Sequence, residues 1–111
     1  MKTGEIPQSV RMALKELKGA LTELYGDRLE GVYLYGSYAR GDFTEDSDID
    51  VLIALKGHVD TYEELARLSE VVSDICLRHD VLIATYPIPA TWIAERNSPL
   101  FVNIRREGCL I

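Results

Sequence analysis

The sequence has little cysteine and no surplus of positive charge, and each shortage excludes a class of protein. Its two cysteines, Cys76 and Cys109, lie far apart and lack the spacing of a metal site. We therefore expect reduced thiols in a cytoplasmic protein, not a disulfide framework. Twelve Lys and Arg stand against 18 Asp and Glu, for a net charge of −6. An acidic chain lacks the basic surface with which proteins hold nucleic acid, so we expect no direct nucleic-acid partner.

Long apolar runs, repeats and linkers are also missing. No run of apolar residues approaches membrane-spanning length, and no secretory leader opens the chain. We therefore expect neither membrane insertion nor secretion. Nothing divides the 111 residues into parts, and this length suits a single domain, residues 1–111, around one core.

The residues that carry chemistry are concentrated in segment 31–53, GVYLYGSYARGDFTEDSDIDVLI. Two apolar, β-prone runs flank a turn rich in Gly, Ser, Asp and Thr, and the second run opens with Asp48 and Asp50. Side chains two positions apart on a strand point the same way, so these two carboxylates share a face and repel each other. A cation between them relieves the repulsion, and ligands that are all oxygen favour Mg²⁺ or Mn²⁺.

The turn before the carboxylates suits a phosphate group. Gly36 lets the backbone approach a ligand closely, and we expect Ser37 to cap a short helix whose first N–H groups face an anion. Arg40 lies one helical turn from Ser37, so both can face the same anion. We count Ser47, which directly precedes Asp48, among the nucleotide-binding residues. A phosphate cradle beside a metal pair predicts a site for a metal–nucleoside triphosphate.

The remainder of the chain predicts a small α/β (α+β) fold. Apolar residues recur at spacings of three and four from Val10 to Leu24, which indicates a helix of about 17 residues. Further helices are expected at 61–78, with Thr61 as N-cap and Tyr62 on its buried stripe, and at 91–95 and 98–107. Strands are expected at 29–35, 48–55 and 80–86, which makes a mixed sheet of about three strands with helices packed mainly on one face.

The order of these elements predicts a third acid at the site. A strand, a crossover helix and a strand form a right-handed parallel unit. The strands at 48–55 and 80–86 therefore start at one edge of the sheet, and the antiparallel strand at 29–35 ends there. This arrangement brings Asp80 to Asp48 and Asp50. Three carboxylates can hold two divalent ions for transfer of a nucleotidyl group, with Asp80 on the second ion.

The run Gly36-Ser37-Tyr38-Ala39-Arg40-Gly41 through Ser47-Asp48-Ile49-Asp50 resembles the signature of the nucleotidyltransferase superfamily that includes DNA polymerase β. The particular residues of this motif are similar to those of the minimal nucleotidyltransferases known as MNT proteins. The resemblance implies a polymerase β-like core, ATP as substrate, Mg²⁺ as cofactor, and a third carboxylate at Asp80. It further implies an antitoxin that forms a hetero-oligomer with a HEPN-domain ribonuclease toxin and transfers AMP to a tyrosine of that toxin.

Two alternatives stay open from the sequence. One is an antitoxin that masks its toxin by binding alone, although the intact set of acids argues against it. The other is a small-molecule nucleotidyltransferase that works as a homodimer. The apolar residues 108–111 need a cover, from the core or from another subunit, and with Arg105 and Arg106 beside them they suit docking on a partner.

Overall fold

The computed structural model describes residues 6–111. In chain order its elements are α1 (Gln8–Tyr25), the 3₁₀ turn η2 (Gly26–Arg28), β1 (Leu29–Tyr35), α2 (Ser37–Arg40), β2 (Ile49–Leu55), α3 (Thr61–His79), β3 (Ile83–Pro89), α4 (Thr91–Glu95), α5 (Pro99–Glu107) and β4 (Cys109–Leu110). Within the described residues, no helix is long and apolar enough to cross a membrane.

A four-stranded mixed sheet forms the centre of the fold, in the order β3-β2-β1-β4. β1 runs antiparallel to β2, and β2 runs parallel to β3, which confirms the predicted topology. The additional strand is β4, which pairs antiparallel with β1 through Leu34–Cys109 and Tyr33–Leu110. The apolar end of the chain is thus covered by its own sheet, although Leu110 stays 67% exposed.

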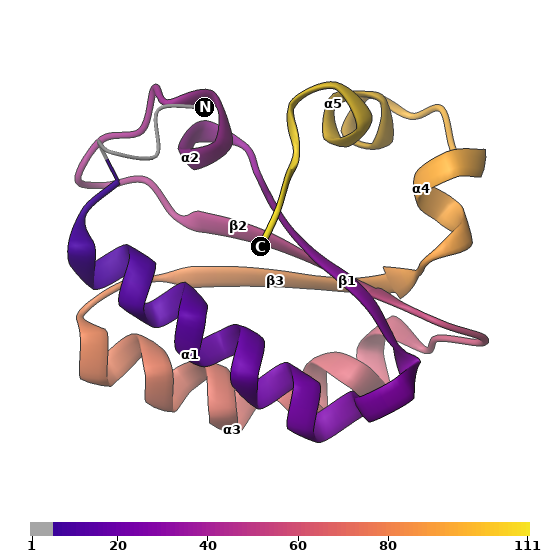
Figure 1. Ribbon diagram of the computed structural model, residues 1–111, viewed down its shortest axis with the longest axis horizontal. Helices are drawn as coiled ribbons and strands as arrows, with labels where there is room; N and C mark the ends of the chain where they lie inside the picture. The colour runs from indigo at the N-terminus through magenta and orange to yellow at the C-terminus, as the bar shows by residue number, and fades with distance from the viewer. Residues whose placement is uncertain (1–5) are drawn as a thin grey trace.

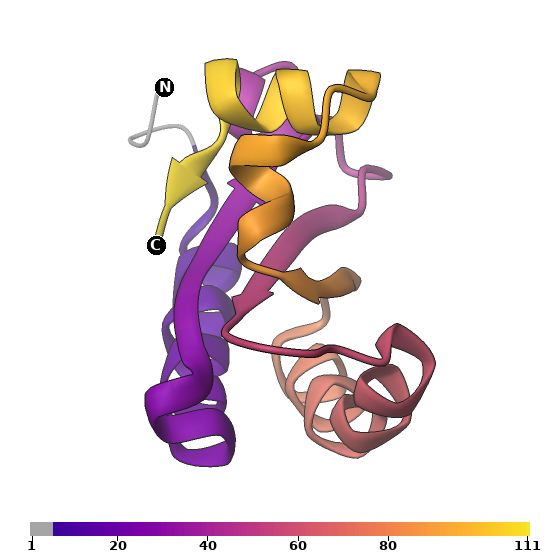
Figure 2. The same cartoon turned by 90° about the vertical axis from the view of Figure 1, so that its right-hand side faces the viewer.

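Helices cover both faces of the sheet. The two long helices, α1 and α3, lie on one side, and α4 and α5 lie on the other (Figures 1 and 2). β1 shows why both layers form, because alternate side chains of this strand point to opposite faces of the sheet and pack into two different apolar clusters. Val32 and Leu34 pack with α1 and α3, whereas Tyr33 and Tyr35 pack against the cluster that contains Phe101.

The start of α3 differs from its prediction in two places. The N-cap is Asp60, whose Oδ1 accepts a hydrogen bond from the Glu63 N–H at 3.1 Å, and not Thr61. Tyr62, expected on the buried stripe, is 86% exposed. The residue that turns inward in this first turn is Glu64, a carboxylate that is only 4% exposed.

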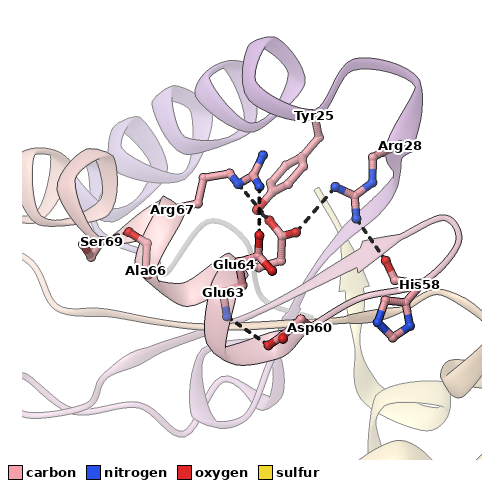
Figure 3. Close-up of polar contacts among 9 residues, drawn as sticks. All are labelled: Tyr25, Arg28, His58, Asp60, Glu63, Glu64, Ala66, Arg67 and Ser69. Atoms are coloured by element: carbon pink, nitrogen blue, oxygen red, sulfur yellow. Dashed lines mark hydrogen bonds and ion pairs between the residues drawn. The ribbon is translucent and has the colours of Figure 1, made fainter.

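Glu64 is buried because three partners surround it (Figure 3). The Tyr25 hydroxyl donates a hydrogen bond to Glu64 Oε1 at 2.8 Å, and Arg28 and Arg67 approach the same carboxylate at 3.5 and 3.4 Å. Burial and the neighbouring Glu64 raise the pKa of Tyr25, so its proton stays available for the bond. This cluster ties the end of α1 to the start of α3 and satisfies a buried charge that would otherwise destabilise the fold.

The strand expected at 80–86 begins and ends later than predicted, at Ile83 and Pro89. Asp80 does not open this strand. It adopts the left-handed conformation (φ 53°) that ends α3, and its N–H donates to the Cys76 carbonyl. Pro87 and Pro89 fit inside β3 because it is an edge strand, which pairs with β2 alone and tolerates missing N–H groups.

Candidate active site

The turn between β1 and α2 depends on two glycines. Gly36 (φ 73°) and Gly41 (φ 87°) bracket α2 with backbone conformations that other residues rarely adopt. The N–H groups of Ala39 and Arg40 both donate to the Gly36 carbonyl at 3.1 Å. Gly36 is therefore the N-cap, and Ser37 is the first helical residue, where we had expected the cap. The N–H groups of Ser37 and Tyr38, which precede these two donors, come before the first residue that can find an acceptor carbonyl within the helix.

Gly36 also makes room for Asp50. A Cβ atom at Gly36 would lie 2.3 Å from Asp50 Oδ2, far inside van der Waals contact. The close approach that requires glycine here is thus that of a carboxylate from the neighbouring strand. It fixes Asp50 directly against the turn that precedes α2.

Asp48 and Asp50 lie together without partners of their own. Asp50 is on β2, opposite Tyr35 of β1, and Asp48 directly precedes the strand. Neither side chain makes a hydrogen bond or ion pair with any residue of 6–111. Burial and the charge of Asp48 raise the pKa of Asp50, and Arg40 opposes this shift. Two unpartnered carboxylates, one of them partly buried, are the arrangement that a divalent cation stabilises.

A hollow of about 500 Å³ gathers these residues. From the segment that sequence analysis singled out, its lining comprises Tyr35, Gly36, Ser37, Arg40, Ser47, Asp48 and Asp50. The structure thereby brings together six of the seven predicted site residues, and Tyr35 beside them.

Asp80 is the seventh, and it lies elsewhere. It lines a second hollow of about 730 Å³, next to Val81 and Leu82, and the two hollows share Ser47 in their linings. Across residues 6–111 no three Asp, Glu, His or Cys side chains form a group that could hold a metal ion. In this structure Asp80 therefore does not form one group with Asp48 and Asp50. The physical reason is the left-handed turn at Asp80, which places it at the end of a helix, three residues before β3 begins.

Ser47 and Arg40 have contacts that define what each can do. Ser47 Oγ accepts a hydrogen bond from the Thr44 N–H at 2.9 Å, so the hydroxyl closes the loop that leads into Asp48. Arg40 donates through Nε to Asp42 Oδ2 at 3.2 Å, and its Nη1 lies 3.9 Å from Glu107 Oε2. The Arg40 side chain is 44% exposed, which leaves its guanidinium accessible to an anion in the hollow.

Sequence analysis missed the contribution of α5. Leu100, Asn103 and Glu107 line the same hollow from this helix, which lies beside α2 at one end of the molecule (Figures 1 and 2). The sequence signal that could have revealed it is the spacing of three and four residues between Leu100, Asn103 and Glu107. Phe101 and Ile104 are buried against the sheet, so the residues beside them form an edge of the helix that faces the site.

Arg105, proposed from the sequence as part of a docking surface, makes contacts within the fold. It donates to the carbonyls of Ile93 and Arg96 at 2.6 and 2.7 Å and to Asn97 Oδ1 at 2.9 Å. These bonds hold the connection between α4 and α5. They use the guanidinium within the fold, and so they help to keep α5 in place beside the hollow.

The donor set of the hollow fits a divalent cation bound together with a phosphate compound. Mg²⁺ in proteins commonly takes one or two carboxylates and completes its shell with phosphate oxygens and water. Asp48 and Asp50 match that pattern, and Arg40 supplies one positive charge beside them. An anion in this hollow would meet more carboxylates than cations, so it needs the added positive charge of a metal ion.

Known proteins resemble the chain at the level of sequence. A family model described as "Nucleotidyltransferase domain" matches residues 14–107. A Methanocaldococcus jannaschii protein that is provisionally named a protein adenylyltransferase (MJ0141) is 41% identical over 71 residues, which are 64% of this chain and 71% of that protein. A second protein of that provisional name from the same organism (MJ0604) is 40% identical over 83 residues, 75% of this chain and 70% of its own length.

Solved structures share the fold at lower identity. The chain superimposes on a chain of a toxin–antitoxin crystal structure with AMP-PNP at a TM-score of 0.58 and 22% identity, covering 88% of this chain and 70% of the other. A crystal structure of a provisionally named nucleotidyltransferase from Sulfolobus solfataricus gives a TM-score of 0.57 at 22% identity, covering 96% and 88%. At this identity the similarity shows a common fold.

Proposed function

Because the chain belongs to the nucleotidyltransferase domain family and is a nucleotidyltransferase, we propose that it transfers AMP from ATP to a hydroxyl group of a partner protein. The observation that carries this proposal is the pair of unpartnered carboxylates, Asp48 and Asp50, in one hollow with Arg40. The provisional adenylyltransferase names of the sequence relatives support ATP and a protein acceptor.

Each residue of the hollow has a role in this reaction. Asp48 and Asp50 hold the divalent ion, Mg²⁺ or Mn²⁺, which supplies charge neutralisation for the triphosphate when bound. The turn at Gly36 and Ser37 and the guanidinium of Arg40 orient the terminal phosphates. Ser47 holds the loop that positions Asp48. The proposal gives Asp80 no ligand role, since that residue lines another hollow.

The chemistry is a substitution at phosphorus. The acceptor oxygen forms a bond to the α-phosphorus of ATP, and the bond from this phosphorus to the bridging oxygen of pyrophosphate breaks. The acceptor hydroxyl gives up its proton to water, and pyrophosphate leaves with the bonding electron pair. Arg40 lies where it can stabilise charge on the departing phosphates, the part of the reaction that benefits most from fixed positive charge.

The acceptor belongs to a toxin in this proposal, and the protein acts as its antitoxin. The fold is shared with a chain of a toxin–antitoxin complex, and the MNT-like wording of segment 36–50 points to a HEPN-type toxin with a tyrosine acceptor. The charge of −6 favours a basic partner surface through steering of the encounter. Residues 109–110 form β4 and pair with β1. The apolar side chain of this segment that remains exposed for contact with a partner is Leu110.

The test uses the chain co-expressed with the protein encoded beside its gene. Mass spectrometry of the partner should show an added AMP group of about 329 Da, as expected for covalent nucleotidyl transfer, and Asp48→Asn should abolish the addition. A partner that never gains mass, yet is neutralised equally by wild type and by Asp48→Asn, would establish the alternative of an antitoxin that acts by binding alone. Transfer of AMP to a small molecule in place of the partner would favour the alternative of a small-molecule nucleotidyltransferase.

A further inference from the structure

The α5 wall, by which we mean Leu100, Asn103 and Glu107, is a rigid side of the hollow that the phosphate chemistry does not use. Its three members occur at spacings of three and four residues, so they share one edge of the helix. Phe101 and Ile104, 4% and 3% exposed, anchor the same helix on the sheet. The wall is therefore held in position before any ligand arrives.

The α5 wall has a direction relative to the phosphate turn. Glu107 lies at the phosphate end, with Oε2 3.9 Å from Arg40 Nη1. A helix rises about 1.5 Å per residue, so Asn103 lies about 6 Å and Leu100 about 10 Å farther along the wall. A nucleotide that keeps its terminal phosphates at Arg40 and extends along α5 places its base beside Asn103 and Leu100.

The chemistry of these two residues suits a purine. Leu100 is half-buried and packs with the apolar cluster that includes Tyr35, which provides an apolar surface for a ring. The Asn103 side chain is exposed and forms no hydrogen bond to any residue of 6–111. Its amide offers one donor group and one acceptor side by side. Along the edge that carries N7, adenine presents its amino donor next to the N7 acceptor, and an amide can match this pair with two hydrogen bonds. Along the same edge guanine presents two acceptors, O6 and N7, and an amide can match only one of them.

We propose that the α5 wall is the nucleobase subsite of this enzyme and that Asn103, in contact with the N7 edge of the base, selects adenine over guanine. The inference rests on the proposed function in one respect, namely that a nucleoside triphosphate binds in this hollow. Sites for small ligands commonly combine an apolar surface with a few well-placed polar groups, as Leu100 and Asn103 do here.

The experiment is calorimetry on the full chain with Mg²⁺ and three probes: ATP, GTP and inorganic triphosphate, which has no base. Asn103→Ala should weaken ATP binding about five- to tenfold, the value of one lost hydrogen bond with its partner left unsatisfied. Triphosphate binding should stay unchanged. Asn103→Asp, which can only accept, should lower the ratio of ATP to GTP affinity further. Arg106→Ala changes the exposed neighbour on α5 that does not line the hollow, and it should alter none of the three affinities.

Three results would overturn the inference. Equal weakening of ATP and triphosphate would show that Asn103 acts on the phosphates or on the fold. Unchanged affinities for all three probes would show that the base lies elsewhere. Unchanged ATP affinity with slower transfer to the partner protein would make α5 a wall for the acceptor. Base-selective binding without any AMP transfer would instead support the subsite and refute the proposed function alone.

Discussion

Replacing Asp48 and Asp50 with asparagine tests whether the carboxylate pair serves a cation or the fold. If it serves a cation, the metal-free protein carries a repulsion that the double amide variant relieves. Strand residues two positions apart are separated by about 6.7 Å. Two unit charges at that distance repel by about 0.6 kcal/mol in water and about 2.5 kcal/mol at an effective dielectric constant of about 20.

The solvent exposure of the two side chains indicates where the repulsion energy lies between these two values. Asp48 is exposed and Asp50 is half-buried, so solvent screens much of the repulsion. We expect the double variant to gain about 1 kcal/mol in free energy of unfolding without metal. For a chain of this size that gain corresponds to an increase in Tm of about 4 °C. Nucleotidyl transfer should be abolished in the same variant.

The gain should depend on pH with a definite sign. Burial and Asp48 raise the pKa of Asp50 above its ordinary value of 3.8 in the folded protein. Protonation therefore favours the folded state, and this contribution is fully present below the unfolded pKa and lost as pH rises through the folded pKa. The advantage of Asp50→Asn over wild type should be complete at pH 7 and disappear near pH 3, where the wild-type carboxyl is already neutral.

Circular dichroism melts at pH 3 and pH 7, with and without Mg²⁺, measure these effects. Mg²⁺ should raise the Tm of wild type and leave that of the double variant unchanged. Glu45→Gln, which removes an exposed charge from the same loop outside this hollow, should show neither effect. A double variant that is less stable than wild type and still transfers AMP would refute the reasoning, because the carboxylates would then hold the fold together.

Three further substitutions test the site and its support. Gly36→Ala places a Cβ 2.3 Å from Asp50 Oδ2 at a φ of 73°, and should lower the free energy of unfolding by about 1–3 kcal/mol in urea titrations and abolish transfer. Arg40→Ala should weaken triphosphate binding by about 1.5–3 kcal/mol in calorimetry, the value of one charge-assisted contact. Glu64→Ala leaves the buried Tyr25 hydroxyl without its acceptor and should destabilise by about 1–3 kcal/mol in urea, with transfer retained at low temperature.

Each of these has a matched control. Gly19→Ala changes a glycine in the middle of α1 with no atom within 4 Å of the added Cβ, and should stabilise the helix slightly. Arg106→Ala removes a charge outside the hollow. Glu63→Ala removes an exposed neighbour of the buried glutamate and should change stability by less than about 0.5 kcal/mol. Equal losses in a variant and its control would remove the specific explanation for that position.

The sequence by itself determined the chemistry of segment 36–50. Gly36, Ser37 and Arg40 lie within one turn, and Asp48 and Asp50 lie two residues apart at the start of β2. Such short-range relations follow from local geometry alone. The order of strands and helices was also predictable, because apolar periodicity and the handedness of the crossover leave few topologies. The order of elements did not, however, predict where a single residue such as Asp80 would lie relative to the site.

Tertiary structure decided the rest of the site. Asp80 lies apart from Asp48 and Asp50 because α3 ends at this residue in the left-handed conformation. A sequence pattern does not specify how the last turn of a helix ends. The α5 wall reaches the hollow only because Phe101 and Ile104 dock that helix on the sheet. Glu64 is buried only because Tyr25, Arg28 and Arg67 converge on it from separate elements. For α5 and for Glu64 the deciding contacts join residues distant in sequence, and their energies exist only in the folded chain.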